Sequence, residues 1–267
     1  MKKRADVLLV EKDLARSREK AKAMIIAGLV RVGGAPVSSA SDMLDENCEL
    51  TLAGDNCPYV SRGGLKLEKA LREFGIDLGG KTCLDIGCST GGFTDCMLQN
   101  GAAFVYAVDV GYGQFDWALR NDERVKLFER TNARYLDESS FEKSVDFASI
   151  DVSFISLKLI LPVLLKISHS DGLQAVALIK PQFEAGREKV GKKGVVRDPR
   201  VHEEVLYAVL GFAQEAGFGV LGIDFSPVKG PNGNIEYLAH IKSGAERAGL
   251  KDLIGSTVAN SHKSLVE

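Results

Sequence analysis

From Lys81 onward, short apolar runs alternate along the chain with segments of mixed polarity. Apolar runs of strand length fall at 82–87, 104–109, 125–128, 145–151 and 174–180. A helical pattern at Phe93–Gln99 separates the first two runs, which is the alternation expected of βα units. Repeated βα units place their strands in parallel within one sheet.

The last third of the chain adds a long helix and two strands. An Asp-Pro pair at 198–199 supplies an N-cap and a first helical residue, and Gly217 ends the helix. Strands predicted at 220–225 and 235–241 flank a loop with Asn-Gly at 232–233, a strong turn signal. Together these elements predict an α/β fold with a doubly wound, mostly parallel, Rossmann-like sheet and an antiparallel edge.

A small α+β module is predicted before this sheet. Residues 1–57 contain two short helices, with Ser17 as the N-cap of the second, followed by short strands. Residues 58–64 carry a proline and paired glycines and form the natural linker. The α/β domain then covers 65–244, and we expect the tail at 245–267 to hold a short helix at most.

The composition fits a soluble globular protein. Of the 267 residues, 45% are hydrophobic and 26% are charged, which excludes a wholly disordered chain. The longest apolar runs are much shorter than the roughly 20 residues of a membrane-spanning helix. Acidic residues interrupt the N-terminal segment, so no signal peptide is expected. We therefore expect a cytoplasmic protein without a membrane partner; the oligomeric state stays open, with a monomer slightly favoured.

The cysteines argue against a metal centre. There are five, which cannot all pair, and none of them forms a C-x-x-C motif. The four histidines are scattered and share no ligand spacing with the cysteines. We therefore expect free thiols and no metal site.

The net charge of −2 hides a strong asymmetry. Residues 1–40 hold nine lysines and arginines against four acidic residues, so the rest of the chain is acidic. This basic head is a pattern that suits binding to nucleic-acid phosphates, and an ordinary solvated helix face would give the same count. A second basic segment, 184–200, is interpreted as a lid or RNA-contact loop, or equally as a solvated surface loop. The candidates for RNA contact are Lys3, Arg4, Arg16, Arg18, Lys20 and Arg62.

A glycine-rich loop follows the first predicted strand of the sheet. It spans 85–93, between strand and helix, where glycines let the backbone approach a ligand closely. The pattern differs from the G-x-G-x-x-G of nicotinamide enzymes and is closer to a loop for S-adenosylmethionine (SAM). Asp109 ends the second strand and suits the ribose hydroxyls of an adenosine. The candidate SAM-binding residues are Asp85, Gly87, Ser89, Gly91, Gly92, Phe93 and Asp109.

Four charged residues occupy positions from which they can meet at one edge of the sheet. Asp151 ends the fourth strand and Lys180 ends the fifth, and ligands bind at the carboxyl ends of parallel strands. Glu236 starts the last strand, and Lys66 lies in the first turn of the helix after the linker. A lysine at the end of an apolar strand is desolvated, which lowers its pKa and lets its amine accept a proton from a hydroxyl. Each residue alone could be a surface lysine or a strand-end cap; the case rests on their convergence.

These motifs resemble a known family. The span 58–241 is similar to the FtsJ-type SAM-dependent RNA ribose 2′-O-methyltransferases, whose Lys-Asp-Lys-Glu tetrad maps onto the four residues just named. Residues 4–50 resemble the small RNA-binding domain first described in ribosomal protein S-four, most clearly at 15–18 and in the helix that follows. The whole chain resembles the TlyA (hemolysin-A-like) subfamily in the stretches 61–67, 85–93, 129–134, 151–156, 180–184 and 233–237.

The resemblance implies 2′-O-methylation of cytidine in ribosomal RNA, with SAM as methyl donor and ribosomal subunits as partners. In this hypothesis neutral Lys180 is the base, Lys66 orients the hydroxyl, and the two carboxylates position the lysines. Asn132 is a further candidate, near the adenine of SAM. Because a 2′-hydroxyl in folded RNA is not freely presented, the target nucleotide has to be extracted.

Three other functions stay open at this point. The name of the subfamily suggests a haemolysin or pore-forming protein, but no signal peptide, membrane span or long basic amphipathic helix is predicted. A small-molecule methyltransferase could use the same fold, and the basic head argues against it. A catalytically silent RNA-binding protein is disfavoured by the complete tetrad.

Overall fold

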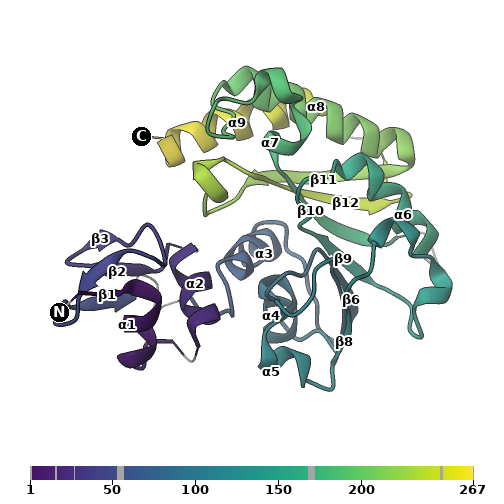
Figure 1. The fold of residues 1–267 in the computed structure, drawn as a ribbon. Coiled ribbons are helices and arrows are strands. Elements are labelled where there is room, and N and C mark those ends of the chain that lie inside the picture. Colours follow the sequence, from purple (N-terminus) through teal and green to yellow (C-terminus); the bar gives the residue numbers. More distant parts are fainter. Residues whose placement is uncertain are drawn as a thin grey trace. The chain divides into compact units, whose positions relative to one another are not determined.

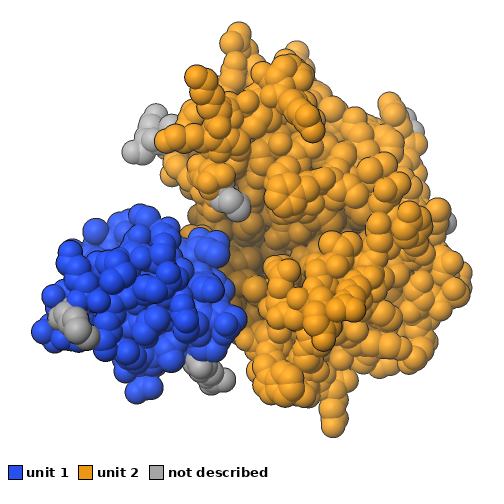
Figure 2. Space-filling view, viewed as in Figure 1, with its two compact units in different colours: residues 1–57 blue, residues 58–267 orange. Residues whose placement is uncertain are grey.

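The structure is a computed structural model, and it describes residues 2–15, 17–26, 28–52, 57–167, 172–246 and 249–266. The chain divides into two compact units, Met1–Cys57 (unit 1) and Pro58–Glu267 (unit 2), drawn in Figure 1 and coloured separately in Figure 2. Each unit has a hydrophobic core of its own.

Unit 1 is a small α+β module. Its elements are β1 (Lys2–Arg4), α1 (Ala5–Glu11), α2 (Arg18–Ile26), β2 (Val30–Val32), β3 (Ala35–Pro36), β4 (Met43–Asp45) and β5 (Leu50–Leu52). β1 pairs with β4, while β3, β2 and β5 form a second antiparallel sheet. The helices pack over a small core that includes Leu8, Leu9 and Ile25. Ser17 caps α2 as predicted, since its Oγ accepts a hydrogen bond from the backbone N–H of Lys20 at 3.2 Å.

Unit 2 is built on one seven-stranded sheet, in the order β11-β12-β10-β9-β6-β7-β8. All neighbouring strands are parallel except β12, which is antiparallel to both β10 and β11. The predicted doubly wound, mostly parallel sheet with an antiparallel edge is therefore confirmed. The strands are β6 (Thr82–Ile86), β7 (Phe104–Val108), β8 (Val125–Phe128), β9 (Phe147–Ile150), β10 (Gln174–Ile179), β11 (Phe218–Phe225) and β12 (Tyr237–Ser243).

Helices cover both faces of this sheet (Figure 1). α6, α8 and α9 share a hydrophobic core with one face. α3 and α4 lie on the other face, where Thr94 of α4 bonds to Asp85 of β6 and Phe74 stacks on His240 of β12. The helices are α3 (Gly63–Glu73), α4 (Gly92–Gln99), α5 (Trp117–Arg120), α6 (Leu161–Ile167), α7 (Pro181–Glu184), α8 (Pro199–Ala216) and α9 (Lys251–Val266).

The end of the chain differs from its prediction. Instead of a short helix at most, the tail forms α9, a helix of 16 residues. Ile254 and Val258, which lie one turn apart, insert into the core that α8 and the sheet share. The small polar residues between them hide this apolar stripe in the sequence. Among the described residues, no helix is both long and apolar enough to cross a membrane.

The topology brings the ends of several strands to one edge of the sheet. β6, β7, β9 and β10 run parallel, so the residues that follow them emerge on the same side. β12 runs in the opposite direction, and Tyr237 at its start pairs with Ile179 at the end of β10. The residues just before β12 therefore reach the edge at which the parallel strands end.

Candidate active site

Four charged side chains meet in unit 2 at this edge. The Nζ atom of Lys66, in the first turn of α3, lies 2.6 Å from Glu236 Oε2, just before β12. The Nζ atom of Lys180, directly after β10, lies 2.6 Å from Oδ1 of Asp151, directly after β9. All four residues line one cavity of about 530 Å³. Folding thus brings together groups as far apart in the chain as 170 positions.

The two ion pairs are shielded from water. Glu236 is fully buried, and both lysines are nearly so. Burial lowers the pKa of Lys66, but the charges of Asp151 and Glu236 outweigh this effect, and the pKa of Lys66 is raised overall. Lys66 is therefore held as an ammonium. A second contact orients Lys180: its Nζ also donates a hydrogen bond to Ser153 Oγ at 2.8 Å.

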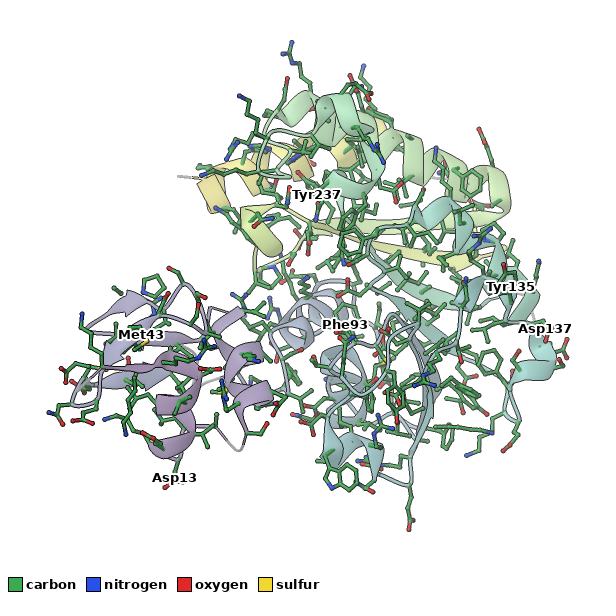
Figure 3. The ribbon with its side chains drawn as sticks, in the orientation of Figure 1. Asp13, Met43, Phe93, Tyr135, Asp137 and Tyr237 are labelled. Atoms are coloured by element: carbon green, nitrogen blue, oxygen red, sulfur yellow. The ribbon has the colours of Figure 1, made fainter. Side chains whose placement is uncertain are left out.

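The glycine-rich loop between β6 and α4 forms another wall of this cavity. Gly87 has a φ of +87°, and a Cβ there would stand 2.5 Å from the backbone oxygen of Asp151. A Cβ at Gly92 would collide with Ser61 Oγ. Gly91, the N-cap residue of α4, has a φ of +96° and turns the chain without lining the cavity. The loop residues that line it are Gly87, Cys88, Ser89, Thr90, Gly92 and Phe93, the last of which is labelled in Figure 3.

A second cavity, of about 400 Å³, adjoins the first. The two share Gly87, Ser89, Asp151, Ser153 and Phe154. Asp109 and Asn132, which the sequence analysis predicts to lie near an adenosine, both line the second cavity. The carboxylate of Asp109 accepts hydrogen bonds from the N–H groups of Ser89 at 2.8 Å and Gly111 at 2.6 Å. The Oδ1 atom of Asn132 accepts one from the N–H of Arg134 at 3.1 Å.

Asp85 lies beneath the loop and not in either cavity. Its carboxylate is fully buried and accepts hydrogen bonds from Thr94 Oγ1 at 2.7 Å and Ser149 Oγ at 3.1 Å. Burial raises the pKa of Asp85 to about 7. Asp85 thus fastens α4 to the sheet beneath the loop, and its predicted contact with the cofactor stays a prediction.

Two residues that the sequence did not single out complete the cavities. Phe154 is 90% exposed, has a φ of +63°, lines both cavities and lies with its ring centroid 4.9 Å from that of Phe183. Gln182 donates from Nε2 to Glu236 Oε1 at 3.3 Å, and within the described chain its buried Oε1 has no hydrogen-bond partner. The adjacency of Phe154 to the Asp151 motif was the only available signal. Gln182 could have been suspected from its place two residues after Lys180.

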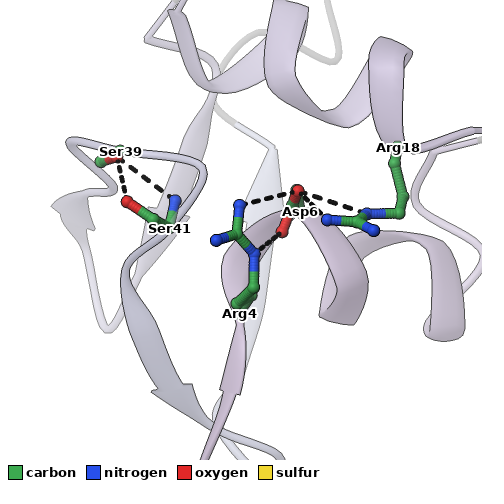
Figure 4. A network of polar contacts seen from close by, with 5 residues as sticks. All are labelled: Arg4, Asp6, Arg18, Ser39 and Ser41. Carbon is green, nitrogen blue, oxygen red and sulfur yellow. Dashed lines mark hydrogen bonds and ion pairs between the residues drawn. The ribbon is translucent and has the colours of Figure 1, made fainter.

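The basic candidates of unit 1 are partly engaged within the unit. Lys3 forms an ion pair with Glu11 at 2.7 Å. Arg4 and Arg18 both bind the carboxylate of Asp6 (Figure 4). Of the remaining candidates, Lys20 and, in unit 2, Arg62 are exposed, whereas Arg16 lies outside the described residues.

The basic segment 184–200 borders the first cavity. Val190 and Gly194 line it. Two of the positive charges of the segment are paired, Lys189 with Glu204 and Arg200 with Asp198. The exposed Lys192 and Lys193 lie between the two residues that line the cavity, so the segment carries positive charge to its rim.

The sequence matches two known families. Residues 59–243 match the FtsJ-like methyltransferase family, and residues 3–50 match the S4 domain. The chain is 52% identical to YqxC of Bacillus subtilis over 271 aligned positions, which cover 100% of this chain and 96% of YqxC. It is 44% identical to the 16S/23S rRNA (cytidine-2′-O)-methyltransferase TlyA of Mycobacterium tuberculosis over 261 positions, 96% of this chain and 97% of that protein.

A solved structure is similar over nearly the whole chain. It belongs to a Streptococcus thermophilus protein that bears the name hemolysin, with 51% sequence identity and a TM-score of 0.79. The match covers 98% of this chain and 96% of that one. The arrangement of strands and helices described above is thus shared with an independently solved relative.

Proposed function

Because the chain belongs to the FtsJ-like methyltransferase family and carries an S4 domain, we propose that it transfers a methyl group from SAM to the ribose 2′-hydroxyl of cytidine in ribosomal RNA. The name of the Mycobacterium tuberculosis relative supports the base and the RNA. The observation that carries the proposal is the cavity in which two lysines and two carboxylates meet beside the glycine-rich loop. Ribosomes are the substrate in this proposal, which places the protein in the cytoplasm.

The residues of the two cavities fit SAM. Gly87 lies so close to the backbone of Asp151 that there is no room for a side chain at this position. The main chain is therefore uncovered where the amino-acid end of the donor would bind. Asp109 retains acceptor capacity for ribose hydroxyls in addition to its two backbone hydrogen bonds. Asn132 lines the same cavity and would lie near the adenine. SAM, when bound, supplies a methyl group on an already activated sulfonium.

The tetrad then has to orient and deprotonate a weakly acidic hydroxyl. Lys180 is the acceptor of the 2′-hydroxyl proton in this proposal, and Asp151, 2.6 Å away, stabilises the ammonium that results. Lys66, held as an ammonium by Glu236, donates a hydrogen bond to the ribose oxygen as negative charge develops there. Ser153 fixes the direction of the Lys180 amine.

Two further features suit a nucleotide drawn out of folded RNA. The exposed ring of Phe154 at the mouth of both cavities offers a surface on which a base can stack. The unpartnered Oε1 of Gln182 inside the first cavity can accept a hydrogen bond from a donor that the substrate brings. Neither feature is needed for a substrate that is small and freely soluble.

The proposal is tested with unmodified ribosomal subunits. Small and large subunits from a Bacillus subtilis strain that lacks YqxC are incubated with the protein and labelled SAM, and the label is mapped to a nucleotide and to the 2′-oxygen. Lys180→Ala should lose methylation by about 10²–10⁴-fold while binding SAM as the wild type does. Lys166→Ala removes an exposed lysine of α6 and serves as the matched control. Label on a base atom, or full activity in Lys180→Ala, would contradict the proposal.

A further inference from the structure

A buried acid joins two arginines of unit 1. Asp6, in the first turn of α1, is fully buried, yet its carboxylate receives two arginines (Figure 4). Oδ1 accepts from Arg4 Nε at 2.9 Å, and Oδ2 accepts from Arg4 Nη2 at 3.2 Å. Oδ2 also accepts from Arg18 Nε at 3.3 Å and Arg18 Nη2 at 2.8 Å. The side chains of Arg4 and Arg18 are 42% and 51% exposed, so the acid lies below and the guanidinium groups lie at the surface.

Both arginines start from well-anchored backbone. Arg4 ends β1, where it pairs with Met43 of β4, and it directly precedes α1. Arg18 is the first residue of α2, whose N-terminus Ser17 caps. The two helices pack together through the core of unit 1, which includes Leu8 and Ile25. The carboxylate therefore joins two guanidinium groups whose main chains are already fixed relative to one another.

The arginines keep donors that face outward. Each arginine donates hydrogen bonds to Asp6 from its Nε and Nη2 atoms. The Nη1 atoms of both arginines have no hydrogen-bond acceptor within the described chain. The hydrogen bonds from Arg4, followed by those from Arg18, hold the pKa of Asp6 well below its usual range. The carboxylate is therefore ionised at any working pH and keeps both guanidinium groups in place. Guanidinium groups bind the oxygens of phosphate with well-defined geometry.

We propose that Asp6 is a positioning residue that holds Arg4 and Arg18 as a preformed clamp for a backbone phosphate of RNA. The inference rests on the proposed action on ribosomal RNA and deepens it by naming the contact. A long, flexible arginine normally loses rotamer freedom when it binds, and side chains already held in place lose less. Asp6 thus strengthens RNA binding although its own charge repels RNA.

Charge and preorganisation predict opposite results when Asp6 is neutralised. If only the number of charges mattered, Asp6→Asn would remove a negative charge and tighten RNA binding. If the clamp matters, the neutral amide accepts the arginines more weakly, both side chains become mobile and binding weakens. Neutralising Glu11, the exposed partner of Lys3 in the same unit, makes the same change in charge without touching the clamp.

The experiment measures dissociation constants of the full-length variants for the unmodified ribosomal subunits, across a series of salt concentrations. We expect Asp6→Asn to bind at least about fivefold more weakly than the wild type, while Glu11→Gln binds equally or more tightly. SAM affinity, which belongs to unit 2, should stay unchanged in both. Binding by Asp6→Asn that is as tight as that of the wild type would overturn the clamp.

A second pair of variants keeps the test decisive if Asp6→Asn does not fold. Arg4→Lys and Arg18→Lys preserve the charge and the salt dependence but cannot bridge acid and phosphate with one planar group. Each should weaken binding about threefold or more, and unchanged affinity in both would overturn the clamp. Failure of the wild type to bind or methylate ribosomal RNA would overturn the proposed function together with the clamp. Methylation by a wild type whose Asp6 and arginine variants bind normally would overturn the clamp alone.

Discussion

Removing Lys66 while leaving Glu236 in place tests the buried ion pair most directly. Glu236 is fully buried, and its Oε2 lies 2.6 Å from Lys66 Nζ. Lys66→Met preserves the length of the side chain but removes the cation from the carboxylate, whose other hydrogen bond given for the described residues comes from Gln182 Nε2 at 3.3 Å. Breaking one side of a buried pair costs about 3–5 kcal/mol. For a unit of this size, each kcal/mol lowers Tm by about 2–4 °C, so we expect a loss of about 6–20 °C.

The loss should depend on pH in a defined direction. Without its cation, the buried carboxylate of Glu236 is unfavourable in the folded variant, because burial disfavours the charged form of an acid. The folded variant then keeps a proton that the unfolded chain releases above about pH 4.3. Its stability therefore falls as pH rises from about 4 towards 8, and its gap to the wild type widens over the same range.

Thermal unfolding at pH 5 and pH 8, followed by far-UV circular dichroism, measures both effects. The variant Lys66→Met/Glu236→Gln removes both charges and should recover most of the lost stability, since the cost comes from an unpaired buried charge. It should not recover methylation. A loss in Tm smaller than about 2 °C for Lys66→Met at pH 8 would refute the reasoning, and so would a double variant that is no more stable than Lys66→Met.

Three other outcomes follow from the site. Asp85→Asn should gain about 4 kcal/mol of stability relative to the wild type as pH rises from about 4 to 7, and no more above that, because the folded wild type keeps a proton on this buried acid, whose pKa is about 7, that the unfolded chain releases near pH 4. Urea unfolding across this pH range measures the difference, and a difference that stays constant would contradict the prediction. Gly87→Ala should weaken SAM binding, measured by calorimetry, by about tenfold or more. Gly101→Ala should leave SAM binding unchanged, because Gly101 has a similar φ of +88° but a Cβ added there would have no neighbour closer than 3.4 Å. Phe154→Ala should lower kcat/KM on ribosomal subunits by about 5–100-fold while Tm stays nearly unchanged. Tyr135→Ala, which removes another exposed aromatic side chain, should leave kcat/KM unchanged. Equal effects of the two substitutions would argue against base stacking on Phe154.

The parts of the fold that local chemistry determines could be predicted from the sequence. Asp198 accepts a hydrogen bond from the N–H of Arg200 at 3.0 Å, and Gly217 ends α8 with a φ of +109°. These are the N-cap and the glycine stop that the residue types predict. β1 was missed because three basic residues in succession show no apolar alternation, and only its pairing with β4 makes it a strand. Elements that depend on a distant partner leave little trace in their own sequence.

The same distinction applies to the site. The ends of β9 and β10 placed Asp151 and Lys180 correctly at one edge, but the pairing of Lys66 with Glu236 rather than with Asp151 depends on packing. Asp85 looks like Asp109 in sequence, since both occur near the end of a strand. Asp85, however, still lies inside β6 and points towards α4, whereas Asp109 follows the last residue of β7 and reaches the cavity.

Asp151 links the two halves of the site. Its backbone N–H donates to the oxygen of Ile86 at 2.9 Å, and its backbone oxygen faces Gly87 so closely that no side chain fits between them. Its side chain holds Lys180. The loop proposed to bind the methyl donor and the lysine proposed to take the proton are thus fixed to the same residue. The proposed in-line transfer requires donor and acceptor to be closely aligned, and the attachment of both to one strand end contributes to that alignment.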